Sequence, residues 1–180
     1  MELLSHYTPD SEKFSIDETF LDMTSTIHLF GDPLTTADRI RNQIRDELGF
    51  TVNVGISSNK LLAKMASDFE KPDKCHTLFP EEVPEKMWPL PIRDLFLVGG
   101  SAQKKLERMG LRTIGQLAAC DLSILQSQLG EKYAQTIHRY ANGIDDSPVE
   151  PKEAASKGCG NSITLSRDVS DYETACHVLL

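Results

Sequence analysis

The sequence predicts an α+β fold, with strands and helices alternating up to about residue 80 and a small all-helical unit after it. Two observations predict the first part: alternating apolar residues in 14–24 and 51–56, and helical apolar spacing in 32–48 and 59–69. A third observation predicts the second part: after Pro80, prolines and glycines separate short helical stretches. With 39% hydrophobic and 26% charged residues, the composition is that of an ordinary soluble globular protein.

The elements of the first part follow a β-α-β-α order. Residues 14–24 begin as an alternating strand, and Asp32-Pro33 then opens a helix that Gly49 ends. The apolar residues that recur at helical spacing within it are Ala37, Ile40, Ile44 and Leu48. A second alternating strand over 51–56 precedes a helix reaching about Phe69, for which Ser57 or Ser58 is the expected cap.

The second part consists of short helices up to about residue 144. Residues 145–157 contain two prolines and several charges and suit a linker. Residues 161–169 resemble a strand, and Ser170 can cap a final helix that continues to Leu180. We therefore expect a further domain to begin here and to be truncated.

Charge and cysteine content exclude several classes. The formal charge of −8 argues against a surface that binds nucleic acid throughout, so any such contact must be local. The four cysteines form no C-x-x-C pair, which argues against a zinc site or a disulfide framework. Because the chain has neither a signal-peptide pattern nor an apolar run of membrane-spanning length, we expect a cytoplasmic protein without membrane contact.

The most informative acidic residues are the neighbours Asp17 and Glu18. Adjacent residues of a regular strand point to opposite faces, so both carboxylates can serve one metal centre only at a turn or bulge. Two converging carboxylates would suit Mg²⁺, and a pair of such ions could activate a 3′-hydroxyl and stabilise a leaving pyrophosphate. The alternative is an exposed hairpin with two solvated acids.

Lysines follow one face of the helix expected over 59–69. Lys60, Lys64 and Asp68 recur at intervals of four residues, and Lys71 comes just past the helix end. Because Pro72 disfavours a helical conformation at Lys71, we expect this lysine on a loop, where its ammonium could hold a triphosphate. A solvated face joined by i, i+4 charge pairs is the alternative.

Residues 91–114 have the outline of a helix-hairpin-helix motif. Gly99 and Gly100 would expose backbone N–H groups at a helix start, where they can hold a DNA phosphate. Lys104 and Lys105 belong to a local surplus of positive charge that follows. Leu97 occupies the position where the motif usually has its first glycine. Turns of this kind also simply connect packed helices.

In this order, these motifs resemble the Y-family translesion DNA polymerases of the DinB and UmuC kind, the ImpB/MucB/SamB family. The resemblance covers nearly the whole chain. Its most specific parts are the sequences Ser15-Ile16-Asp17-Glu18, Phe20-Leu21-Asp22, and Gly55 through Asp68 ending in Lys71-Pro72. Further similarity lies at Leu90-Pro91, Gly110 through Leu117, and Gly143-Ile144-Asp145.

The resemblance implies a partial palm with an antiparallel sheet in residues 1–80, a helix-hairpin-helix thumb in 81–150, and a linker with a truncated little-finger start in 151–180. It implies that Asp17 and Glu18 are catalytic ligands of a two-Mg²⁺ site and that Lys71, with Lys64 as a further candidate, contacts the incoming dNTP. Gly99, Gly100, Lys104 and Lys105 would contact DNA. Primer-template DNA and dNTP are the expected partners, with a sliding clamp as a further candidate.

The resemblance also indicates what this chain lacks. The family's first catalytic aspartate and its fingers precede the region that begins near Tyr7, so we expect an internal fragment that has no polymerase activity itself. The expected activity, DNA-directed nucleotidyl transfer in damage tolerance, would belong to the intact parent. Two other hypotheses stay open: a non-catalytic DNA-binding module with a palm-like scaffold, and a cyclase-like enzyme acting on nucleoside triphosphates.

Overall fold

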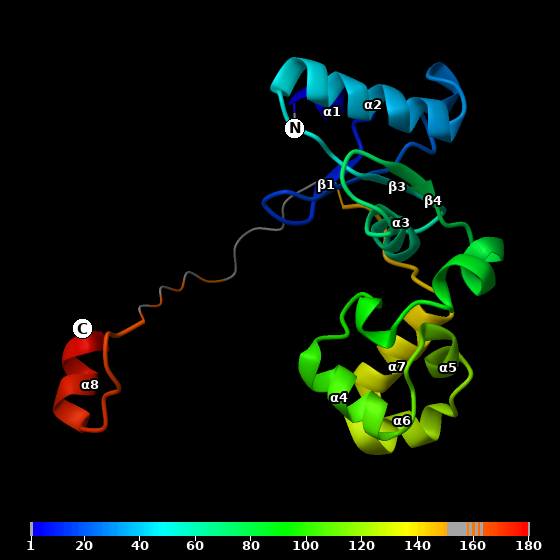
Figure 1. Cartoon of the computed structure of the whole chain (residues 1–180). Coiled ribbons are helices and arrows are strands. Elements are labelled where there is room, and N and C mark those ends of the chain that lie inside the picture. Colours follow the sequence, from blue (N-terminus) through cyan, green and yellow to red (C-terminus); the bar gives the residue numbers. More distant parts are fainter. Residues whose placement is uncertain (1, 151–157, 159, 161, 163, 180) are drawn as a thin grey trace.

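The computed structural model describes residues 2–150, 158, 160, 162 and 164–179. Figure 1 shows an α/β unit (residues 2–79) at one end and a helical unit (residues 80–144) at the other. Helix α8 (Tyr172–Leu179) follows later in the chain. The expected α+β class is confirmed in this coarse form.

Strands in the α/β unit form two separate pairs. Strands β1 (Ser11–Lys13) and β2 (Thr19–Leu21) pair antiparallel, with Glu12 opposite Phe20. Strands β3 (Val54–Ile56) and β4 (Cys75–Thr77) pair in parallel, with Gly55 opposite His76. The antiparallel sheet that was predicted is therefore found only in the first pair. The parallel pair arises because α3 (Lys60–Ser67) supplies the crossover between its strands.

Helix α2 (Pro33–Leu48) begins and ends where the sequence predicted. The Asp32 carboxylate accepts hydrogen bonds from the N–H groups of Leu34 and Thr35, and Gly49 ends the helix at a φ of 76°. Ala37, Ile40 and Ile44 are buried as predicted, whereas Leu48 is exposed. Tyr7, Ile40 and Ile44 form a small core, so α2 is held against the N-terminal segment that includes α1 (Glu2–Ser5).

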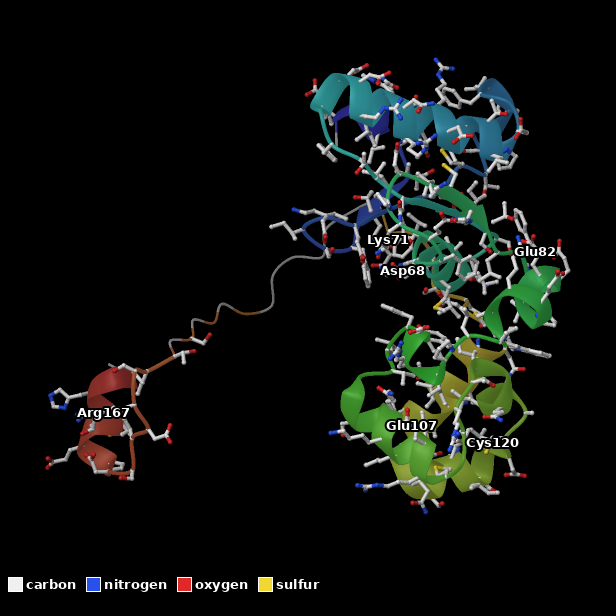
Figure 2. The ribbon with its side chains drawn as sticks, in the orientation of Figure 1. Asp68, Lys71, Glu82, Glu107, Cys120 and Arg167 are labelled. Carbon is white, nitrogen blue, oxygen red and sulfur yellow. The ribbon has the colours of Figure 1, made fainter. Side chains whose placement is uncertain are left out.

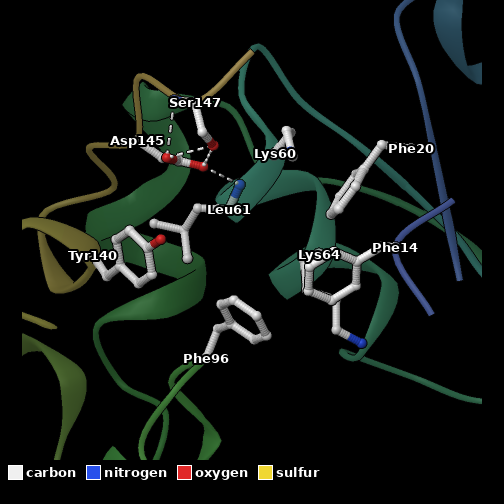
Figure 3. A pocket seen from close by; sticks show the side chains of 9 residues that line it. All are labelled: Phe14, Phe20, Lys60, Leu61, Lys64, Phe96, Tyr140, Asp145 and Ser147. Carbon is white, nitrogen blue, oxygen red and sulfur yellow. Dashed lines mark hydrogen bonds between the residues drawn. The ribbon is translucent and has the colours of Figure 1, made fainter. Parts of the chain in front are cut away.

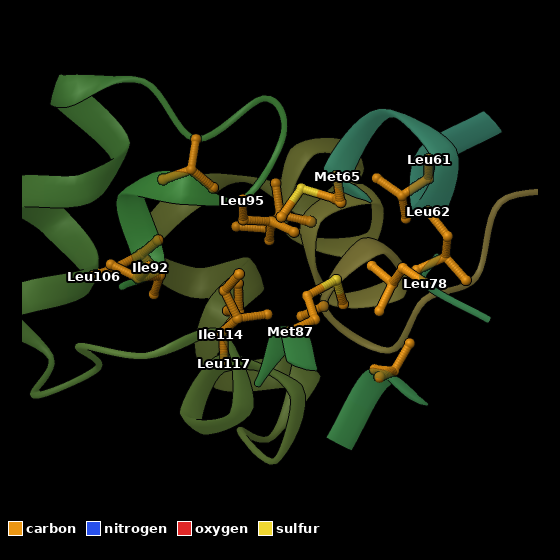
Figure 4. Packing of buried hydrophobic residues seen from close by; sticks show 14 of the residues in the cluster. Leu61, Leu62, Met65, Leu78, Met87, Ile92, Leu95, Leu106, Ile114 and Leu117 are labelled. Carbon is orange, nitrogen blue, oxygen red and sulfur yellow. The ribbon is translucent and has the colours of Figure 1, made fainter. Parts of the chain in front are cut away.

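Helix α3 begins one or two residues later than predicted. The Asn59 side chain, rather than that of Ser57 or Ser58, accepts from the N–H of Leu62. Leu61, Leu62 and Met65 are buried and Phe69 packs beside them, as the apolar spacing predicted. They share one core with Leu78 of the α/β unit and with Met87, Leu95 and other residues of the helical unit (Figure 4).

The helical unit contains short turns followed by four helices. The turns are a 3₁₀ turn at Pro80–Glu82, a π turn at Val83–Met87 and a 3₁₀ turn at Ile92–Asp94. The helices are α4 (Gly100–Arg108), α5 (Ile114–Ala118), α6 (Leu122–Leu129) and α7 (Glu131–Ala141). A further 3₁₀ turn, Ile27–Leu29, lies in the α/β unit.

Three predictions concern the C-terminal residues. Residues 151–157 of the expected linker lie outside the described part of the chain. The described residues among 161–169 contain no strand, so the predicted strand is not found in them. Asp171, rather than Ser170, caps α8, since its carboxylate accepts from the N–H of Thr174 at 2.8 Å.

Candidate active site

Asp17 and Glu18 lie in the loop that joins β1 to β2, which spans residues 14–18. The N–H groups of Phe14 and Ser15 both donate to the carbonyl oxygen of Glu18, at 2.9 and 3.2 Å. Because one carbonyl oxygen accepts both hydrogen bonds, the backbone turns here, and the two acidic residues do not lie on a regular strand. The pair therefore lies in a turn, the kind of backbone in which adjacent carboxylates can serve one metal centre.

Lys64 of α3 connects this loop to the helix. Its ammonium forms an ion pair with the Glu18 carboxylate and lies 3.2 Å from Asp68 Oδ2. Burial alone would lower the pKa of Lys64, but the hydrogen bonds to Glu18 and Asp68 outweigh burial and raise that pKa. Lys64 is therefore a firmly charged group, and its side chain is only 16% exposed.

Lys71 belongs to the same group of charged side chains. Its Nζ lies 2.7 Å from Asp68 Oδ1, and Figure 2 labels these two side chains. Asp68 also contacts Lys64, so it lies between two lysines. Burial would raise the pKa of Asp68, but hydrogen bonds from Lys71 and Lys64 lower it below its ordinary value. The Lys71 side chain is 61% exposed and can exchange Asp68 for an anionic ligand at small desolvation cost.

The structure thus gathers Glu18, Lys64, Asp68 and Lys71, and it leaves Asp17 outside this group. The Asp17 carboxylate instead accepts from Ser15 Oγ at 2.7 Å within the loop. Asp68 was not predicted as a site residue. Its spacing, four residues after Lys64 and three before Lys71, is the sequence signal that could have identified it.

The acidic pair suits a magnesium ion by its donor chemistry. Asp17 and Glu18 offer carboxylate oxygens, and Mg²⁺ in proteins usually takes one or two carboxylates and fills its shell with water and phosphate oxygens. In the part of the chain that the structure describes, no three His, Cys, Asp or Glu side chains gather as a metal site. The pair would therefore hold the ion only with water, phosphate or further ligands.

A cavity of about 90 Å³ adjoins this group of charges. Figure 3 shows Phe14 and Phe20 from the β1–β2 hairpin on one side and Phe96 and Tyr140 from the helical unit on the other. The ring centroids of Phe14 and Phe96 are 5.9 Å apart, so the hairpin and the helical unit are in direct contact. No pattern in the sequence indicates this contact.

The segment that follows α7 returns to α3. Asp145 Oδ2 accepts from the N–H of Leu61 at 3.2 Å, and Asn59 Nδ2 donates to the carbonyl oxygen of Gly143 at 2.9 Å. Lys60 pairs with Glu12 at 2.7 Å, and Glu12 also accepts from the N–H of Glu150 at 2.8 Å. The start of the lysine-bearing helix is therefore fixed by residues from both units.

The predicted hairpin turn lies before α4. Leu97 has a φ of 71°, in the left-handed region where glycine is usual, and its carbonyl oxygen accepts from Tyr133 Oη at 2.9 Å. Gly99 is the residue before α4, and no side chain caps the helix start. Lys104 and Lys105 are both exposed on α4. The turn therefore keeps the backbone conformation of its glycine position although a leucine occupies it.

Two known family models match this chain, one over the unit with the acidic hairpin and the lysine-bearing helix and one over the helical unit. One, the impB/mucB/samB family, matches residues 1–68, and the other, described as DNA polymerase-iota, thumb domain, matches residues 93–145. The chain is therefore similar to proteins of the impB/mucB/samB family.

Curated relatives named DNA polymerase IV are similar along the whole chain. The protein of Clostridium acetobutylicum is 44% identical over 180 residues, and that of Clostridium kluyveri is 45% identical over 181; each match covers 100% of this chain. DNA polymerase IV 2 of Bacillus subtilis is 40% identical over 182 residues. The chain spans about 45% of the length of the Clostridium relatives.

Solved structures agree with this assignment. DinB from Sulfolobus solfataricus aligns with a TM-score of 0.75 at 28% identity, covering 84% of this chain and 45% of that one. A structure described as an insertion ternary complex of Dbh DNA polymerase aligns with the same TM-score and identity, covering 83% of this chain and 44% of that one.

Among the helices of the described residues, none has the length and apolar composition that a membrane span requires.

Proposed function

We propose that this chain supplies the acidic pair, the triphosphate-binding lysines and a DNA-phosphate contact of a lesion-bypass DNA-directed DNA polymerase. The contact between Glu18 and Lys64 carries the proposal, because it joins the acidic hairpin to the lysine-bearing helix. The names of the relatives support the polymerase activity. We assign the palm to residues 1–80, the thumb to 81–150, and the linker and start of the little finger to 151–180.

In this proposal Asp17 and Glu18 hold magnesium. Magnesium bound there would activate the primer 3′-hydroxyl and stabilise the charge of the leaving pyrophosphate. Lys64 holds the Glu18 side chain in place through their ion pair. Because Lys71 is exposed at the end of the same group, it is the lysine best placed to bind the triphosphate of an incoming dNTP.

The turn before α4 would hold the DNA backbone without reading sequence. A helix start without a side-chain cap leaves N–H groups available to a phosphate, and Gly99 and Gly100 let the phosphate approach closely. Lys104 and Lys105 add positive charge on the same helix. The left-handed φ of Leu97 supports this role, since the turn keeps its shape without the usual glycine.

The test is a hybrid polymerase, in which this chain replaces the matching 180 residues of the Clostridium acetobutylicum DNA polymerase IV. Primer extension across an abasic template with Mg²⁺ is compared between the hybrid and its Glu18→Gln variant. We expect a loss of about 100-fold or more, since an electrostatic contact to the reacting groups is removed. Glu12→Gln is the matched control, because Glu12 lies in the same hairpin and also pairs with a lysine of α3.

Equal extension by the hybrid and its Glu18→Gln variant, both folded and bound to primer-template, would remove Glu18 from the essential site. It would favour the alternative of a non-catalytic DNA-binding module. Metal binding has its own readout: Mn²⁺ added to the 180-residue chain should broaden the NMR signals of residues 15–18. That broadening should weaken in Glu18→Gln and persist in Glu12→Gln.

We further propose that the 180-residue chain does not extend a primer without the rest of a polymerase. The described residues offer no third acidic or histidine ligand beside Asp17 and Glu18, which supports this expectation. Template-dependent incorporation by the purified chain would contradict it.

A further inference from the structure

The loop from Asp68 to Lys74, which carries Lys71, is held by Asn53 just before β3. Asn53 Nδ2 donates to the carbonyl oxygens of Ser67 and Glu70, at 3.1 and 3.2 Å. Its Oδ1 accepts from the N–H of Lys74 at 3.2 Å. One side chain therefore fixes the loop backbone on both sides of Lys71.

Asp73 ties the same loop to α2. It has a φ of 59°, and aspartate is among the few residues that tolerate this region. Its Oδ1 lies 2.8 Å from Arg41 Nη1, and its Oδ2 lies 3.2 Å from Arg45 Nη1. Arg41 Nη1 also donates to the carbonyl oxygen of Asp73 at 3.1 Å. Because Arg41 and Arg45 are one helical turn apart, both reach Asp73 from one face of α2.

This contact is shielded and rigidly supported. The side chains of Arg41 and Asp73 are only 17% and 24% exposed. Arg41 Nε and Nη2 donate to Asp38 Oδ1 at 3.3 and 3.1 Å, which fixes the guanidinium plane. The nearby Arg41 guanidinium lowers the pKa of Asp73, so the carboxylate stays charged at neutral pH. Ile40 and Ile44 anchor this stretch of α2 in the small core.

We propose that Arg41 and Asp73 are positioning residues for Lys71, holding its loop so that the ammonium faces the triphosphate site before nucleotide arrives. This inference rests on the proposed role of Lys71. A loop fixed in advance loses less conformational entropy on binding than a loose one, so the contact improves nucleotide affinity. Its removal should therefore raise KM for dNTP more than it lowers kcat.

The experiment measures single-nucleotide incorporation by the hybrid polymerase over a range of dNTP concentrations. For Arg41→Gln we expect KM to rise about 10-fold, the size expected for one charged hydrogen bond, with kcat within about twofold. Arg41→Lys should recover only part of the loss, because a lysine cannot contact the carboxylate and the carbonyl in one plane. Arg39→Gln is the matched control, since Arg39 is exposed on α2 and lies over the ring of Phe30 instead.

A double variant separates positioning from general destabilisation. In a Lys71→Ala background, Arg41→Gln should raise KM by less than about twofold further, because the two changes remove the same interaction. Asp73→Asn and Arg45→Gln are milder changes at the same contact and replace Arg41→Gln if that variant does not fold. Hydrogen exchange at the Lys74 amide of the 180-residue chain should quicken in Asp73→Asn and not in Arg39→Gln.

The outcomes distinguish this inference from the function on which it rests. If Lys71→Ala leaves KM unchanged, the proposed role of Lys71 fails and the inference fails with it. If Lys71→Ala raises KM while Arg41→Gln and Asp73→Asn do not, only the inference is overturned. Fully additive effects of Lys71→Ala and Arg41→Gln on KM would also overturn it, because Arg41 would then act elsewhere.

Discussion

Gly55 offers the sharpest test of how α3 is positioned. It lies on β3 directly against α3, and a Cβ added there would be 1.8 Å from the carbonyl oxygen of Ala63 and 2.6 Å from the nitrogen of Ser67. Both neighbours are backbone atoms of the helix, so no side-chain rotation can relieve the contact. Gly55→Ala must therefore push the lysine-bearing helix away from the strand.

The size of the effect follows from these distances. Real Cβ atoms essentially never come closer than 3.0 Å to another heavy atom, so the Cβ-to-oxygen distance must grow by at least about 1.2 Å. Because the obstructing atoms belong to backbone, we expect a cost at the upper end for overpacked cores, about 3 kcal/mol. A domain of this size would then lose roughly 6–12 °C in Tm.

Urea unfolding of the 180-residue chain, followed by circular dichroism and by Trp88 fluorescence, measures this cost. Gly100→Ala is the matched control, because a Cβ at Gly100 meets nothing within 4 Å. That variant should change the free energy of unfolding by no more than about 0.5 kcal/mol. Equal unfolding midpoints for the two variants would refute the close approach of α3 to β3.

Three further predictions concern the turn, the cap and the charge group. Leu97→Gly should be more stable to urea than Leu97→Ala by about 1 kcal/mol, because a φ of 71° penalises any residue with a Cβ. Asn59→Ala should lower the free energy of unfolding by about 1 kcal/mol through loss of the α3 cap, and Asn59→Asp should lose less because it can still accept from Leu62 N–H. The lowered pKa of Asp68 means that its stabilising contribution is complete above its unfolded pKa and is lost as pH falls through the folded pKa. Between about pH 5 and pH 2, urea midpoints should therefore fall more steeply for the wild type than for Asp68→Asn.

Each of these predictions has a contrary result. Equal stability of Leu97→Gly and Leu97→Ala would mean that the turn relaxes when leucine is absent. An Asn59→Asp variant as unstable as Asn59→Ala would assign the loss to the bond with Gly143 and not to the cap. Parallel pH curves for the wild type and Asp68→Asn would show that Asp68 gains no stabilisation from its lysines.

Local features of the fold could be predicted because their interactions lie within a few residues. Asp32-Pro33 and Gly49 bound α2 through hydrogen bonds inside the helix ends. The apolar face of α3 followed from its spacing. The cap of α3 was predicted at Ser57 or Ser58, and the structure has it at Asn59. Serine and asparagine can both cap a helix, so residue type does not separate neighbouring positions.

The sequence by itself determined which chemistry is present: adjacent carboxylates at Asp17 and Glu18, lysines at one face of a helix, and a glycine turn. Only the tertiary structure decided that Glu18 meets Lys64, 46 residues later, while Asp17 does not. It likewise decided that Arg41 reaches Asp73, 32 residues away. The physical reason is that such contacts depend on how β3, α2 and α3 pack, and packing of distant segments leaves no periodic signal in the sequence.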